Sequence, residues 1–120
     1  MAKKINQFDL DEVFRQLRTN IEFSNLDQNI QMVNVVSSTP NEGKSTVSAN
    51  LARICADKYS NVLLIDCDLR NSSLHKILKT SNASGLSNLL SRFDDSTSVI
   101  NSSEIKVLQT KSGKLLYFLS

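Results

Sequence analysis

The chain has 120 residues, of which 40 % are hydrophobic and 22 % charged, with a formal net charge of +2. This length suits one domain over residues 1–120, and three glycines and one proline exclude a collagen-like or glycine- and proline-rich disordered chain. We expect no nucleic-acid partner, because the net charge is small and the basic residues are scattered. We expect no membrane span, because the apolar runs are short, and no disulfide framework, because there are only two cysteines.

The predicted elements begin with a helix over residues 9–23, where apolar side chains recur at spacings of three and four on one face. A buried strand is expected over 31–37, a helix over 44–58 and a second apolar strand over 62–65. Almost uniformly apolar strands are typical of parallel sheets covered on both faces. This strand–helix–strand order predicts the α/β class, with a parallel sheet flanked by helices.

The second half of the chain predicts shorter elements separated by polar loops. We expect helices over 74–78 and 86–91 and strands over 107–109 and 115–119.

The loop between the first strand and its helix has the composition of a phosphate-binding loop. It follows the pattern Gly-x-x-x-x-Gly-Lys-[Ser/Thr], except that Ser38 stands at the first glycine position. Gly43 allows close approach of a phosphate, Lys44 can neutralise phosphate charge, and Ser45 can place a hydroxyl on Mg²⁺. A helix cap is the alternative, but the flanking apolar strand and amphipathic helix favour phosphate binding. The expected nucleotide-contacting residues are Ser38, Thr39, Pro40, Asn41, Glu42, Gly43, Lys44, Ser45, Thr46 and Arg70.

Two carboxylates follow the second strand, at the edge where open α/β sheets bind their ligands. Asp66 and Asp68 point to the same side of an extended chain, where they can hold Mg²⁺ or accept a proton from an incoming hydroxyl. Arg70 can contact phosphate or an acidic side chain. The alternative is that both aspartates cap the next loop or helix. The upstream phosphate loop favours the functional interpretation.

The first helix carries charged residues at three-residue steps beside its apolar face. From the residues alone, Glu12, Arg15 and Arg18 predict a solvated face with pairing between neighbouring turns.

Taken in order, these segments resemble the bacterial tyrosine kinases of capsular and exopolysaccharide synthesis, the BY-kinases. That family carries a Glu-x-x-Arg-x-x-Arg helix, a loop of the form Ser-x-x-Pro-x-Glu-Gly-Lys-[Ser/Thr], a strand ending Asp-x-Asp-x-Arg, and a later Gly-Leu-Ser. The corresponding segments here are 12–18, 37–45, 62–70 and 85–87. The resemblance covers residues from about 9 to 119, and the order of the motifs is more specific than any one of them.

The resemblance implies a protein-tyrosine kinase that uses ATP and Mg²⁺. Lys44 would hold the ATP phosphates, and Ser45 would ligate the metal. Asp66 and Asp68 would serve the metal and activate the attacking tyrosine hydroxyl, so that Lys44, Asp66 and Asp68 are the implied catalytic residues.

The resemblance also implies assembly and location. Residues 9–24 would be an oligomerisation helix, with Glu12, Arg15 and Arg18 in the subunit interface of a ring, which replaces the solvated-face interpretation. A transmembrane polysaccharide co-polymerase or activator adaptor would hold the chain at the cytoplasmic face of the cell membrane, where its substrates would be protein tyrosines.

The sequence departs from the family in two respects. It has no third acidic strand end after Asp68 and no terminal tyrosine cluster, so we expect the N-terminal portion of a longer kinase. One alternative is an ATPase switch like the septum-placement and plasmid-partition ATPases, whose loop carries an additional lysine where this chain has Thr39. The other is a nucleotide-binding or assembly module without turnover.

Overall fold

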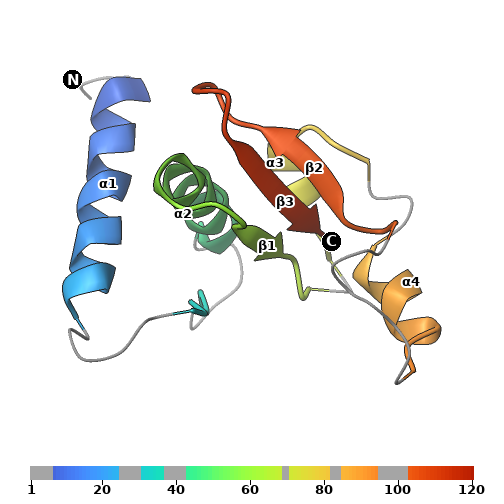
Figure 1. Ribbon diagram of the computed structural model, residues 1–120. Helices are drawn as coiled ribbons and strands as arrows, with labels where there is room; N and C mark the ends of the chain where they lie inside the picture. Colours follow the sequence, from blue (N-terminus) through green and yellow to red (C-terminus); the bar gives the residue numbers. More distant parts are fainter. Residues whose placement is uncertain (1–6, 25–30, 37–42, 69–70, 82–84, 95–102) are drawn as a thin grey trace.

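The computed structural model describes residues 7–24, 31–36, 43–68, 71–81, 85–94 and 103–120. Figure 1 shows the helix α2 lying between the helix α1 and a small sheet. The elements are α1 (Gln7–Phe23), α2 (Lys44–Lys58), β1 (Leu63–Ile65), α3 (Leu74–Ile77), α4 (Leu86–Ser91), β2 (Lys106–Gln109) and β3 (Leu115–Leu119). The predicted α/β class is confirmed.

The sheet has three strands in the order β1-β3-β2. β1 pairs in parallel with β3, so that Leu63 lies opposite Tyr117 and Ile65 opposite Leu119. β2 and β3 form an antiparallel hairpin. The sheet is therefore mixed, with the predicted parallel pair extended by a hairpin. The hairpin turn is joined to α2, because Asp57 accepts hydrogen bonds from the hydroxyls of Thr110 and Ser112.

Two faces of α2 account for the core. Alanines at spacings of three and four (Ala49, Ala52 and Ala56) let the helix approach the sheet closely, where Leu116 and Phe118 cover them. The larger residues on the other side of α2 pack against α1. That second cluster contains Phe14, Leu51 and Ile54, with Leu10, Leu17, Ile21, Val47 and Cys55 partly buried around it. Each fully buried side chain of this size contributes about 1.5–3 kcal/mol to folding.

Gly85 occupies a position where the backbone of Ser120 passes too closely for a side chain. It is buried beside Ser120, the residue that follows β3, and an added Cβ would collide with the Ser120 carbonyl oxygen. The amide of Gly85 donates to Asn88 Oδ1 (2.9 Å), which fixes the entry into α4. The glycine of the Gly-Leu-Ser segment thus has a packing role.

The prediction of a buried strand over 31–37 is wrong for the described part, residues 31–36. These residues have no regular secondary structure, and Met32, Val33 and Val36 are 87 %, 50 % and 77 % exposed. Figure 1 shows the segment (cyan) apart from the sheet. A buried strand needs a hydrogen-bonded neighbour for its amides and carbonyls, and no described strand pairs with this segment.

The helices expected over 44–58 and 86–91 and the strand expected over 115–119 are confirmed at the predicted bounds. Among the described helices, none combines the length and the apolar composition that crossing a membrane requires.

Candidate functional site

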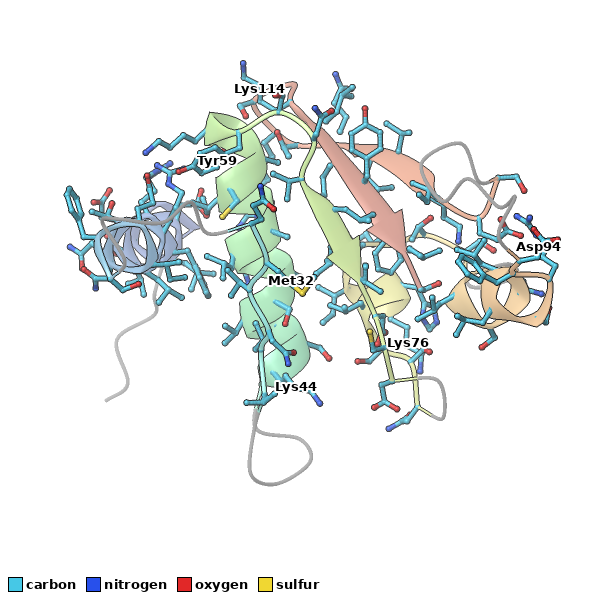
Figure 2. The ribbon with its side chains drawn as sticks, turned by 60° about the horizontal axis from the view of Figure 1, so that its bottom comes forward. Met32, Lys44, Tyr59, Lys76, Asp94 and Lys114 are labelled. Atoms are coloured by element: carbon cyan, nitrogen blue, oxygen red, sulfur yellow. The ribbon has the colours of Figure 1, made fainter. Side chains whose placement is uncertain are left out.

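The N-terminal end of α2 is the first component of the candidate site. α2 begins at Lys44, directly after Gly43, whose backbone is left-handed with φ 81°. Glycine adopts this conformation at no steric cost, whereas an L side chain there is strained. Lys44 is exposed at this end of the helix (Figure 2). The predicted loop residues 38–42 and Arg70 lie outside the described residues.

Asp66 follows β1 and organises the turn into α3. The side chain is buried, with the residue 6 % exposed. Its Oδ1 accepts a hydrogen bond from the amide of Asp68 (3.0 Å), and its Oδ2 accepts from the amides of Ser73 (3.2 Å) and Leu74 (3.3 Å). Because a carboxylate binds amide donors strongly, Asp66 caps the start of α3. The observed contacts are therefore those of the capping alternative, and metal binding by Asp66 stays a prediction.

Asp68 has different surroundings from Asp66. Its residue is exposed, and its Oδ1 accepts a hydrogen bond from the amide of Asn71 (3.0 Å). Of the two carboxylates, Asp68 is therefore the one that an incoming hydroxyl can reach without displacing a buried contact.

Ser73 joins the two components of the site, and the sequence analysis did not identify it. Its hydroxyl oxygen lies 2.6 Å from the hydroxyl oxygen of Ser45, in the first turn of α2, while its amide donates to Asp66. The start of α2 and the carboxyl end of β1 are thus connected through one residue. The available signal was its position directly before the predicted helix 74–78, which is typical of a capping residue.

The oxygen atoms at this site suit Mg²⁺ bound together with a nucleotide. Hydroxyl and carboxylate oxygens are hard ligands, and Mg²⁺ usually takes only one or two of them from the protein, with phosphate oxygens and water completing its shell. The hydroxyl oxygen of Ser45 and the carboxylate oxygens of Asp66 and Asp68 are of this kind, and their binding of Mg²⁺ stays a prediction. The described ranges contain no group of three or more His, Cys, Asp or Glu side chains that could hold a metal ion without a nucleotide.

The three charged residues of α1 that the sequence analysis grouped together, Glu12, Arg15 and Arg18, make different contacts. Arg15 pairs with Glu12 at 3.4 Å on the exposed side of the helix, as the spacing predicts. Arg18 instead turns toward α2, where Nη1 donates to the Ile54 carbonyl oxygen (2.7 Å) and Nε lies 3.7 Å from Glu22 Oε1. Glu12 and Arg15 are therefore open to a partner molecule, whereas Arg18 fastens α1 to its own chain.

A second charged cluster lies at the C-terminal end of α2. Glu22 accepts hydrogen bonds from the ammonium of Lys58 and the hydroxyl of Tyr59, which lower the pKa of Glu22. The same contacts raise the pKa of Lys58 and of Tyr59. Burial raises the pKa of the neighbouring Cys55 thiol. Figure 2 shows Tyr59 where the two helices meet, at the end of α2 opposite Lys44.

Comparison with known proteins assigns the chain to a family. Residues 33–108 match the CbiA family, described as the CobQ/CobB/MinD/ParA nucleotide binding domain. The tyrosine-protein kinase YwqD of Bacillus subtilis (strain 168) is 39 % identical over 97 residues, which cover 81 % of this chain and 41 % of YwqD.

Two further relatives come from enteric bacteria. The tyrosine-protein kinase wzc of Salmonella typhimurium is 38 % identical over 79 residues, covering 66 % of this chain and 11 % of wzc. The tyrosine-protein kinase etk of Escherichia coli (strain K12) is 36 % identical over 89 residues, which cover 74 % of this chain and 12 % of etk. The chain thus spans less than half the length of these curated relatives.

Proposed function

The chain belongs to the CobQ/CobB/MinD/ParA nucleotide-binding domain family, and on that premise we propose that it binds ATP with Mg²⁺ as part of a protein-tyrosine kinase of capsular or exopolysaccharide synthesis. The observation that carries the proposal is the link from Ser45 through Ser73 to Asp66, which joins a helix start to a strand end. The names of the relatives support a kinase over other members of the family.

In the proposed complex, the phosphates lie at the start of α2. The ammonium of Lys44 opposes their charge, and the amides of residues 38–46 and the positive end of the helix dipole add to this attraction. Ser45, Asp66 and Asp68 are the proposed protein ligands of Mg²⁺, and Arg70 is a proposed phosphate contact. Bound Mg²⁺ would offset the negative charge of the phosphate oxygens.

The proposed reaction is transfer of the γ-phosphoryl group to a tyrosine. The phenol oxygen forms a bond to the γ-phosphorus, the bond from that phosphorus to the β–γ bridging oxygen breaks, and ADP leaves. The phenolic proton passes to a carboxylate, which we assign to Asp68 because its side chain is the accessible one. Asp66 holds the turn into α3 in place through its three amide contacts.

The experiment incubates the full-length protein with ATP and Mg²⁺ and measures phosphotyrosine and ADP separately. We expect phosphotyrosine from the wild type and almost none from Lys44→Met or Asp68→Asn. Ser91→Ala, an exposed position on α4, is the control and should leave the signal unchanged. Formation of ADP without phosphotyrosine would identify an ATPase switch instead. Binding of ATP without formation of ADP would identify a module without turnover.

We further propose that α1 contributes to a ring-shaped homo-oligomer through Glu12 and Arg15. Their ion pair is exposed on α1, where Gln16, Thr19 and Asn20 are exposed as well. The combined variant Glu12→Ala and Arg15→Ala should give a monomer by light scattering. Arg18 is left unchanged in this test, because its replacement would also loosen α1 from α2.

The proposal also includes the partners of the kinase. A transmembrane polysaccharide co-polymerase or activator adaptor would hold the protein at the inner face of the cell membrane, close to its tyrosine-bearing protein substrates. Membrane fractionation of cells with and without the adaptor gene tests this location.

A further inference from the structure

Ser73 stands at a capping position but does not cap. It precedes α3 directly, where a serine hydroxyl ordinarily accepts a hydrogen bond from the helix amides, yet its side chain makes no such bond. The buried carboxylate of Asp66 takes that place by accepting from the amides of Ser73 and Leu74. The hydroxyl of Ser73 is thereby released for its contact with Ser45 at 2.6 Å.

The backbone of Ser73 is held on both sides, so that only rotation of its side chain is left to place the hydroxyl. Its own amide is bonded to Asp66, and the next residue, Leu74, is buried against Ala49 of α2 and Phe118 of β3. A serine anchored in this way loses little entropy when it binds another group. The Ser45–Ser73 contact is therefore built into the junction of α2, α3 and the sheet.

We infer that Ser73 is a positioning residue that orients the hydroxyl of Ser45 toward Mg²⁺; this inference rests on the proposed function. A serine hydroxyl has one hydrogen to donate and two lone pairs to accept or ligate with. If Ser45 donates its hydrogen to Ser73, both lone pairs of Ser45 stay available to a cation. A cation near Ser45 favours this direction, because it attracts the oxygen and repels the hydrogen.

A purely structural role for Ser73 makes a different prediction. In that case, loss of the hydroxyl would lower the melting temperature, and it would weaken nucleotide binding equally with and without Mg²⁺. A positioning role links the hydroxyl to the metal, so the Mg²⁺-dependent part of the affinity is the informative quantity.

The experiment titrates a fluorescent ADP analogue into the full-length polypeptide in Mg²⁺ and in EDTA. We expect Ser73→Ala to weaken binding about 3- to 10-fold in Mg²⁺, the effect of one hydrogen bond, and to leave binding in EDTA unchanged. Ser73→Thr keeps the hydroxyl and should restore the Mg²⁺ effect. Ser91→Ala is the control and should bind as the wild type does in both conditions, because its hydroxyl lies on α4 and donates to the Asn88 carbonyl oxygen.

A double-mutant comparison makes the test independent of small losses in folding. In a Ser45→Ala background, the further change Ser73→Ala should have no effect on the Mg²⁺ dependence. The inference is overturned if Ser73→Ala keeps the wild-type gain from Mg²⁺, or loses affinity equally in both conditions. If the wild type binds the ADP analogue equally well with and without Mg²⁺, the inference on Ser73 is overturned but nucleotide binding is not. If the wild type binds the analogue in neither condition, the proposed function is overturned as well.

Discussion

The two ends of α2 differ in how firmly they are attached to the rest of the molecule. At the C-terminal end, Lys58 and Tyr59 bind Glu22, Arg18 binds the Ile54 carbonyl oxygen, and Asp57 holds the hairpin turn. At the N-terminal end, Lys44 is exposed, and the Ser45–Ser73 contact connects the helix to the strand end.

Under the proposed function, the contacts that stabilise the fold and the residues that bind the ligand lie at opposite ends of one helix. The cations at the C-terminal end of α2 interact favourably with the negative end of the helix dipole. The positive end of the dipole and the exposed lysine lie together at the other end, where a phosphate would add the missing negative charge. Substitutions at the two ends should therefore affect different measurements.

The largest expected effect on stability is in the α1–α2 core. Ile54 is 1 % exposed, and its replacement by alanine leaves a cavity between the helices. We expect Ile54→Ala to cost about 2–5 kcal/mol of unfolding free energy. Chemical denaturation measures this loss, and the folded fraction should bind ADP as the wild type does. Val13→Ala, on the exposed side of α1, is the control, and an equal loss there would contradict the assignment of the core.

The next effect distinguishes the two carboxylates of the site. Asp66→Asn places an amide NH₂ among backbone amides that need an acceptor, so we expect a loss of about 1–3 kcal/mol of unfolding free energy. Asp68→Asn, at an exposed position, should leave the melting temperature nearly unchanged. Both variants should lose the Mg²⁺ dependence of nucleotide binding. If both kept a wild-type response to Mg²⁺, the aspartates would be caps alone.

The smallest effect concerns the cluster at the C-terminal end of α2. The pKa of Glu22 is lowered from 4.5 in the folded chain, so its contacts stabilise the fold above that pH and are lost as the pH falls through the lowered value. Glu22→Gln should lower the melting temperature slightly at about pH 7, and the difference from the wild type should shrink at about pH 3. A difference that does not change with pH would assign the effect to packing.

The spacing of apolar residues predicted the helices because a helix is specified by residues within one segment of the chain. Apolar residues on one side of the segment (Val47, Leu51, Ile54 and Cys55), after a loop that ends at Gly43, were sufficient to place α2 at 44–58. The strand expected over 31–37 failed for the opposite reason. Its β-branched residues show only a local preference, whereas a strand also needs a neighbour, which the pattern does not specify.

The candidate site likewise contains residues that one sequence motif indicates and residues that only the packing of distant segments brings together. Lys44, Ser45, Asp66 and Asp68 could be assigned to one site because each motif is contiguous in sequence, and their roles stay predictions. Ser73 was missed because its contact with Ser45 joins residues 28 positions apart, and the Glu22–Lys58 pair joins residues 36 apart. The assignment of Arg18 to a solvated or interface role likewise did not anticipate its bond to Ile54. Such contacts depend on the packing of α1, α2 and α3, and not on any one segment.

Nucleotide binding at the start of α2 is tested by the affinity of the full-length protein for a fluorescent ADP analogue in Mg²⁺, compared between the wild type and Lys44→Met. Lys114→Met is the control, because it removes an exposed lysine from the opposite end of the molecule (Figure 2). We expect Lys44→Met to weaken binding by about 100-fold or more, because it removes the cation that offsets the phosphate charge, and Lys114→Met to bind as the wild type does. Equal affinities for Lys44→Met and the wild type would contradict nucleotide binding at the start of α2.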